Sequence, residues 1–283
     1  MTTPRLAHVL VGRDSGVYRM AYREWGDPGN GHVLVCAHGL TRNGRDFEYL
    51  ASCLARDYRV VAPDIVGRGE SDWLHEPGGY QLPLYVQDML VLIARLNTAD
   101  VSWLGTSMGG LIGMLLAALP GTPIRKLILN DVGPVLSAGA LARIGEYVGK
   151  APLFASREAA EAYIRAVSAP FGPHDDAQWA FLTDVMLRAD ANGWRLNYDP
   201  GIAVPFQSAV TGEDMNLWPY YQRIACPVLL TRGAQSDLLS VETACAMSEQ
   251  GPQANWVDFE GVGHAPTFLH AGQVAAVDDF LRI

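Results

Sequence analysis

Short, unbroken apolar runs alternate along this chain with segments of helical periodicity. The runs occupy residues 33–37, 59–62, 101–104, 126–129, 228–230 and 256–259, and residues 17–25 alternate as a solvent-facing strand would. Helical patterns lie between them, at 46–55, 80–96, 108–119, 241–247 and 271–281. Unbroken apolar runs are typical of strands that are covered on both faces. The alternation therefore predicts an α/β fold, in which a mostly parallel sheet of about eight strands carries helices on both faces.

The alternation is interrupted once, from residue 134 to residue 219. No apolar β-run is found there, whereas helical patterns cover residues 141–148, 157–167 and 177–187. Ser156 is suited to cap the second of these helices. We therefore expect a helical lid, residues 134–219, inserted into a core formed by residues 1–133 and 220–283. For each aromatic side chain of the lid, packing between helices is a simpler interpretation than lining a pocket.

One predicted strand-to-helix junction carries the motif Gly105-Thr106-Ser107-Met108-Gly109. A Gly-x-Ser-x-Gly sequence in this position forms the nucleophile elbow, a sharp and strained turn that exposes the serine hydroxyl above the sheet edge. Glycine is required on both sides because a Cβ there would collide with the neighbouring strand or helix. Ser107 is therefore the predicted nucleophile.

A serine hydroxyl is a weak nucleophile until a base takes its proton, and the base needs a carboxylate to orient it. His264 follows the last predicted strand in a glycine-rich loop and is the candidate base. Asp237 lies just past the apolar run 228–230 and is the preferred acid, because the chain order is then Ser, Asp, His. Asp131, at the end of the preceding predicted strand, is the alternative acid.

Acyl transfer passes through an oxyanion, which needs two preorganised N–H donors. The first is expected from Met108, directly after the nucleophile and at the start of a helix, where the dipole also favours negative charge. The second is expected from Leu40 in the loop after the run 33–37. A backbone donor does not depend on its side chain, so the Met108 and Leu40 side chains are free to wall an acyl pocket.

Together these motifs resemble the α/β-hydrolase superfamily over nearly the whole chain, residues 17–281. The resembling segments are His38-Gly39-Leu40, PDIVGRGES at 63–71, GTSMGG at 105–110, Asp237 and Gly263-His264. The resemblance implies a lid-bearing serine hydrolase with no cofactor and no metal, similar to esterases, 3-oxoadipate enol-lactonase and C–C bond hydrolases. It also implies that His38 and the stretch 64–71 hold the active-site loops and do not react.

The expected activity is hydrolysis of a small-molecule carboxylic ester or lactone through an acyl-enzyme. Two alternatives stay open. The first is C–C bond hydrolysis of a vinylogous diketone acid, whose carboxylate would need a cationic partner such as Arg42 or a lid arginine. The second is a receptor-like protein that binds its ligand with little turnover. A serine at the elbow argues against the dehalogenase and epoxide-hydrolase members of the family, which use Asp there.

Three residues are candidates for substrate binding. Arg42 and Asn43, just past the oxyanion loop, are placed to meet a polar or carboxylate end of a substrate. Trp73 follows the stretch 63–71 and is a candidate for the pocket mouth. The alternative for Arg42 is an ordinary solvated position in a surface loop.

Composition excludes several classes of partner. The net charge is −9 and no cluster of Lys and Arg occurs, so nucleic acid, which such a chain repels on average, is excluded. The N-terminus has no apolar targeting segment, and the apolar stretch 111–119 is too short to span a bilayer. We therefore expect a cytoplasmic protein without membrane association. Its expected oligomeric state is a monomer or a homodimer. The cysteines form no Cys-x-x-Cys pair, which favours buried, reduced thiols over zinc or disulfides at Cys36, Cys53, Cys226 and Cys245.

Overall fold

The computed structural model describes residues 3–14, 16–209 and 211–283, and its centre is an eight-stranded sheet. The strand order is β1 (Arg5–Arg13), β2 (Gly16–Trp25), β4 (Arg59–Pro63), β3 (Val33–Ala37), β5 (Val101–Thr106), β6 (Ile124–Asn130), β12 (Val228–Gly233) and β13 (Asn255–Phe259). All neighbouring pairs from β4 to β13 are parallel, whereas β2 is antiparallel to both β1 and β4. The predicted α/β fold is confirmed.

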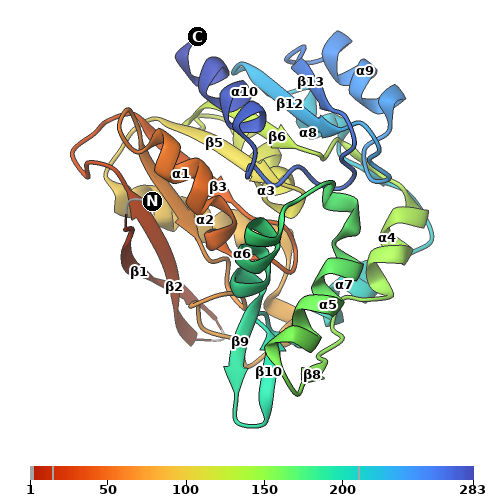
Figure 1. Ribbon diagram of the computed structural model, residues 1–283. Coiled ribbons are helices and arrows are strands. Elements are labelled where there is room, and N and C mark those ends of the chain that lie inside the picture. The colour runs from red at the N-terminus through yellow and green to blue at the C-terminus, as the bar shows by residue number, and fades with distance from the viewer. Residues whose placement is uncertain (1–2, 15, 210) are drawn as a thin grey trace.

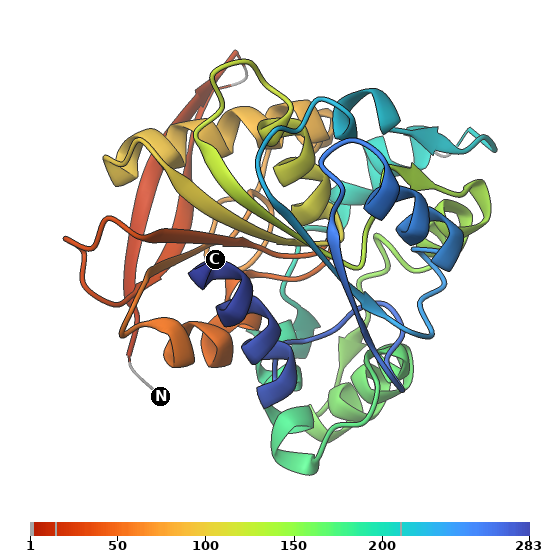
Figure 2. The ribbon, with the colours of Figure 1, turned by 90° about the horizontal axis from the view of Figure 1, so that it is seen from above.

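Helices cover both faces of the sheet (Figures 1 and 2). One face packs against α2 (Leu82–Leu96), α3 (Met108–Ala117) and α9 (Val241–Glu249), and the other against α1 (Glu48–Leu54) and α10 (Ala271–Arg282). Side chains alternate between the two faces along each strand. In β5, Trp103 accordingly packs on the face covered by α2, α3 and α9, and Leu104 packs on the face covered by α1 and α10. Both side chains are fully buried. This two-sided burial explains why the central strands are unbroken apolar runs.

Strand β1 was not predicted, and its burial pattern gives the reason. It pairs with β2 along its whole length at the edge of the sheet, but within it only Val9 and Val11 are buried. Leu6 and Leu10, which are equally apolar, are 52% and 66% exposed. The hydrophobic pattern of the sequence therefore does not follow the faces of this strand.

Between β6 and β12 the chain forms a separate layer, β7 to β11, called the insertion below (residues 135–216). Its helices are α4 (Ala138–Gly145), α5 (Arg157–Val167), α6 (Asp176–Met186) and α7 (Ala203–Ala209), and the short helix α8 (Trp218–Tyr221) follows it. Ser156 caps α5 as predicted, accepting a hydrogen bond from the N–H of Ala159. Asp175 and Gln178 form a capping box at the start of α6.

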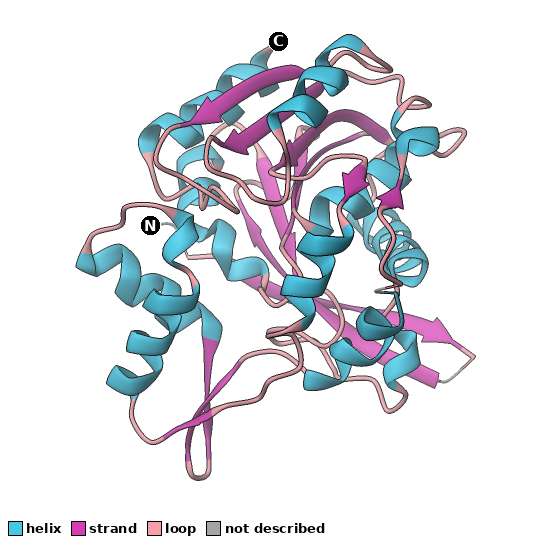
Figure 3. Ribbon diagram, turned by 90° about the vertical axis from the view of Figure 1, so that its right-hand side faces the viewer, coloured by secondary structure: helices cyan, strands magenta, loops and turns pink. Residues whose placement is uncertain are grey.

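The expectation that this segment lacks strands is wrong. A small sheet joins β8 (Leu153–Phe154), β10 (Gly193–Leu196) and β9 (Leu187–Asp190), and β7 (Val135–Leu136) pairs with β11 (Met215–Asn216). The β9–β10 hairpin reaches away from the central sheet (Figures 1 and 3). These strands are two to four residues long, too short to carry a readable alternation of apolar and polar residues.

The described helices include none that is long and apolar enough to cross a membrane. All four cysteines are free thiols, but only Cys36 is buried. Cys226 is half-buried, and Cys53 and Cys245 are exposed, so the expectation of uniformly buried thiols is wrong for these three. Burial raises the pKa of the Cys226 thiol to about 11.

Candidate active site

Ser107 occupies the turn between β5 and α3, with φ 52° and ψ −115°. A non-glycine residue at positive φ is strained, and such strain is often found at functional sites. A Cβ on Gly105 would lie 2.2 Å from the carbonyl of Gly109, and one on Gly109 would lie 2.0 Å from the oxygen of Ala37. The flanking glycines therefore allow α3 to start directly against β3 and β5.

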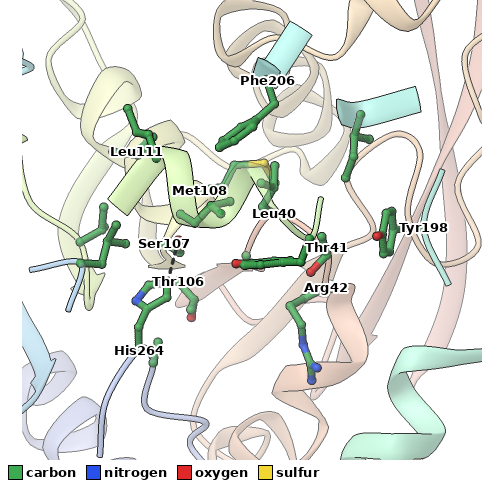
Figure 4. A pocket seen from close by; sticks show the side chains of 18 of the residues that line it. Leu40, Thr41, Arg42, Thr106, Ser107, Met108, Leu111, Tyr198, Phe206 and His264 are labelled. Atoms are coloured by element: carbon green, nitrogen blue, oxygen red, sulfur yellow. Dashed lines mark hydrogen bonds between the residues drawn. The ribbon is translucent and has the colours of Figure 1, made fainter. Parts of the chain in front are cut away.

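His264 reaches the nucleophile from the loop after β13. Its Nε2 lies 3.1 Å from Ser107 Oγ, and its Nδ1 lies 2.7 Å from Asp131 Oδ2 (Figure 4 shows the contact with Ser107). Beside a carboxylate, Nδ1 carries the proton and donates it in a hydrogen bond. Nε2 is then free to accept the proton of the Ser107 hydroxyl, which is the arrangement that activates a serine.

Asp131 is held in place from two sides. It follows β6 directly, is fully buried, and has φ 55°. Its Oδ1 accepts a hydrogen bond from the N–H of Gly233 at 3.0 Å, and its Oδ2 accepts one from the Ser236 hydroxyl at 2.7 Å. With the His264 contact, three donors fix one carboxylate, which orients the imidazole.

The preference for Asp237 as the partner of His264 is corrected by this geometry. His264 Nδ1 contacts Asp131, whereas Asp237 pairs with Arg143 of α4, with 2.8 Å between Asp237 Oδ2 and Arg143 Nη2. The loop after β12 presents the side chain of Ser236 to the carboxylate of Asp131. Both acids lie between Ser107 and His264 in the chain, so the order Ser, Asp, His does not distinguish them.

Asn130, which no sequence motif indicated, links the segments that carry Ser107, Asp131 and His264. Asn130 is fully buried, and its amide donates to Thr106 Oγ1 at 3.0 Å and to the carbonyl of Pro266 at 2.9 Å. Its backbone carbonyl accepts the N–H of Ser107 at 3.0 Å. Asn130 precedes Asp131, Thr106 precedes Ser107, and Pro266 follows His264 by two residues. One side chain thus ties together the chain neighbours of the nucleophile, the acid and the base, and gives Thr106 a structural role.

The loop that carries Leu40 lies beside Ser107 (Figure 4). Among the described residues, we find no acceptor for the backbone N–H of Leu40 or of Met108. Both donors are therefore free for an oxyanion, and Met108 begins α3, where the helix dipole favours negative charge.

His38 holds this loop from within the core. Its Nδ1 donates to the carbonyl of Gly39 at 2.7 Å, and its Nε2 accepts the N–H of Ile65 at 2.9 Å. Burial lowers the pKa of His38 to about 3, so the ring stays neutral and can keep accepting at Nε2. Arg68 donates to the carbonyl of Leu40 at 2.8 Å. These contacts agree with the supporting role expected for His38 and the stretch 64–71.

Ser107 and His264 open into a cavity of about 980 Å³ between the core and the insertion. The volume is at the upper end of the range for small-molecule sites, about 300–1,000 Å³. Apolar side chains form most of its wall, from the core (Leu40, Met108, Leu111, Val132) and from the insertion (Leu141, Ile144, Phe171, Phe206). The cavity therefore suits an apolar chain longer than an acetyl group.

The three candidate substrate-binding residues have other partners. Arg42 lines the cavity, but its Nε and Nη2 bind the Asp46 carboxylate at 2.8 and 2.6 Å, and its guanidinium extends away from Ser107 (Figure 4). Asn43 is buried and donates to the carbonyl of Val185 in the insertion at 2.7 Å. Trp73 lies outside the cavity and carries the Arg188 guanidinium 4.2 Å above its ring.

Within the described residues, no group of three or more His, Cys, Asp or Glu side chains is arranged to hold a metal ion.

A sequence profile for the alpha/beta hydrolase fold matches residues 32–271. A 3-hydroxybutyrate-oligomer hydrolase of Cupriavidus necator is 50% identical over 286 aligned residues, which cover 98% of each chain. A 2-(acetamidomethylene)succinate hydrolase of Mesorhizobium japonicum is 28% identical over 84% of this chain and 83% of its own. The crystal structure of an alpha/beta hydrolase from Novosphingobium aromaticivorans superposes with a TM-score of 0.89 at 35% identity, covering 100% of this chain and 99% of the other.

Proposed function

This chain belongs to the α/β-hydrolase family, and from this premise we propose that it is a serine hydrolase that cleaves carboxylic esters through an acyl-enzyme intermediate. The observation that carries the proposal is the unbroken contact from Ser107 Oγ through the His264 ring to Asp131, at 3.1 and 2.7 Å, beside a large apolar cavity. In this mechanism Asp131, and not Asp237, is the acid that orients His264.

In the proposed first half-reaction, Ser107 Oγ attacks the ester carbonyl while its proton passes to His264 Nε2. The imidazolium that forms keeps its Nδ1–H on the Asp131 carboxylate, which stabilises the positive charge. The oxyanion of the tetrahedral intermediate accepts hydrogen bonds from the N–H groups of Leu40 and Met108. His264 then gives its proton to the leaving alkoxide, and the acyl group stays on Ser107.

In the second half-reaction, a water takes the place of the departed alcohol. His264 accepts a proton from this water, which attacks the acyl carbonyl, and the same two N–H groups hold the second oxyanion. The intermediate collapses when Ser107 Oγ leaves with the proton from His264. The products are a carboxylic acid and an alcohol, and the free enzyme is restored without a cofactor.

We propose short oligoesters of 3-hydroxy acids as the substrates. The 50% identical relative over almost the full length of both chains is a 3-hydroxybutyrate-oligomer hydrolase. An oligomer of this kind is a chain of ester bonds with small apolar branches, which suits an apolar cavity of about 980 Å³. Residues 134–219 would then serve as the lid that holds the oligomer over Ser107.

The test compares hydrolysis of 3-hydroxybutyrate dimer and trimer by the wild-type protein and by Ser107→Ala. We expect the variant to lose at least about 10⁴-fold in kcat with an unchanged thermal midpoint, because the nucleophile is gone and the fold is not affected. A fluorophosphonate should label the wild-type protein at Ser107 only. Retained turnover in Ser107→Ala would exclude the mechanism, and a vinylogous diketone acid turned over faster than any ester would favour C–C bond hydrolysis.

A further inference from the structure

The cavity contains a charged pair that the ester-cleaving chemistry does not use. Arg143 of α4 and Asp237 of the core both line the cavity, on its lid side and its core side respectively. They meet with 2.8 Å between Arg143 Nη2 and Asp237 Oδ2, and their side chains are 43% and 52% exposed. We propose that Arg143 binds the free carboxylate of an acidic oligoester and so makes the enzyme selective for acids over neutral esters. This inference rests on the proposed function.

The chemistry of the substrate requires such a partner. An oligomer of a hydroxy acid ends in one carboxylate at neutral pH. A carboxylate that enters a largely apolar cavity loses hydration, and this cost stays uncompensated unless a cation meets it. Arginine suits this role because its planar guanidinium offers five donors in a fork that matches a carboxylate. The Asp237 contact is at Nη2 and the Arg143 side chain is 43% exposed, so the guanidinium has N–H groups left for a second carboxylate.

The other charged side chains of the cavity are less suited. Arg42 is 8% exposed and is held by two hydrogen bonds to Asp46, whereas the exposed Arg143 has one contact with Asp237. Lys150 also lines the cavity and is exposed, but it carries a point charge on a flexible stem. Arg143, by contrast, belongs to the helix whose Leu141 and Ile144 also line the cavity, and its contact with Asp237 is exposed and easily exchanged for a substrate carboxylate.

Asp237 has a distinct part in this arrangement. It is negative and close to the expected position of the substrate carboxylate, so it weakens acid binding by repulsion while it holds Arg143 in place. An exposed ion pair of this kind contributes little to stability and can rearrange when a ligand arrives. The pair therefore sets how strongly acids are preferred, and the two residues have opposite effects on that preference.

The test measures kcat/KM for two substrates, the 3-hydroxybutyrate trimer as the free acid and the same trimer with its end capped as a carboxamide. The readout is the ratio of the two values. Arg143→Met should lower this ratio about tenfold, since a charge-assisted hydrogen bond is lost, while kcat/KM for the carboxamide stays within about twofold. Asp237→Asn should raise the ratio, and Arg143→Lys should retain part of it. Lys150→Met is the matched control and should leave the ratio within about twofold.

The double variant Arg143→Met/Asp237→Asn separates attraction from repulsion. If Arg143 binds the carboxylate, the ratio stays low after Asp237 is neutralised. A return to the wild-type ratio would mean that Arg143 only shields Asp237, and the proposal would be wrong. A fall in the ratio with Lys150→Met but not with Arg143→Met would also overturn it. If the wild-type protein cleaves both trimers and no variant changes the ratio, this inference fails and the proposed function stands; if it cleaves neither trimer, the proposed function fails as well.

Discussion

The edge of the core that bears Ser107 and the insertion that covers it are held by different kinds of interaction. At the core edge, Asp131, Asn130 and His38 are fully buried, and each is fixed by two or more hydrogen bonds. The charged contacts of the insertion are more open, as in the pair of Arg143 with Asp237 and that of Arg45 with Asp184, whose aspartates are 52% and 53% exposed.

This difference has a physical consequence. A buried, hydrogen-bonded polar group is costly to displace, because a lost partner leaves it without water as a substitute. An exposed ion pair contributes only about 0–1 kcal/mol, so its side chains change partners easily. The groups proposed to react are therefore kept in one geometry, while the groups that meet the rest of a substrate can adapt.

The largest effect is expected where the two candidate acids are compared directly. Asp131→Asn should lower kcat for p-nitrophenyl butyrate by about 10⁴-fold, because the amide no longer holds the required tautomer of His264. Asp237→Asn should leave it within about twofold, because this side chain contacts Arg143 and not His264. Steady-state kinetics on the purified variants, with thermal midpoints as the folding control, decides between them. Equal losses in both variants would contradict the assignment of Asp131.

The next effect concerns stability and compares two glycines. Gly109→Ala at the core edge should destabilise the fold by about 3 kcal/mol or more, since its Cβ would lie 2.0 Å from the backbone oxygen of Ala37. Gly139→Ala in α4 should be neutral or stabilising by up to about 1 kcal/mol, because nothing lies within 4 Å of its Cβ and alanine favours the helix. Urea unfolding midpoints measure both. Similar midpoints for the two variants would contradict the contrast between core edge and insertion.

The smallest effect is a pH dependence of stability. The pKa of His38 is lowered by burial from 6.5 to about 3, so below pH 6.5 the unfolded chain binds a proton that the folded protein excludes. This group should therefore remove about 2 kcal/mol of folding free energy between pH 8 and pH 5, with no further loss from it below its folded pKa. His38→Gln should flatten the dependence of the urea midpoint on pH over this window.

A matched change in the insertion sharpens that comparison. Burial also lowers the pKa of His174, but this ring is only half-buried. His174→Gln should therefore flatten the pH dependence less than His38→Gln does. A larger effect from His174→Gln would show that the insertion, and not the core edge, controls stability in acid.

The sheet and its covering helices could be predicted from the sequence because both faces of the central strands are buried. The apolar runs that result are visible without any knowledge of tertiary structure, as at β3, where all five residues are buried. The edge strand β1 and the short strands of the insertion were missed, because their residues are only partly buried or too few to form a pattern.

At the candidate site, local motifs placed Ser107 and the loop of His264, since each follows a strand with a recognisable glycine pattern. The choice between Asp131 and Asp237 depends on how two adjacent parallel strands end and on which side chain of the following loop turns inward. That information lies in the register of β6 and β12 and not in either segment alone. For Arg42 a signal was present, because Asp46 lies four residues later, the spacing of an intrahelical ion pair.

The two ends of the insertion leave the core at nearly the same point. β7 pairs with β11, and the N–H of Leu217 donates to the carbonyl of Pro134 at 2.6 Å, so the segment is closed at its base. The strands that flank it, β6 and β12, are neighbours in the sheet, and the catalytic candidates all lie outside it. An insertion of different length and lining, grafted between residues 134 and 217, should therefore change which substrates are accepted while it leaves the catalytic candidates in place.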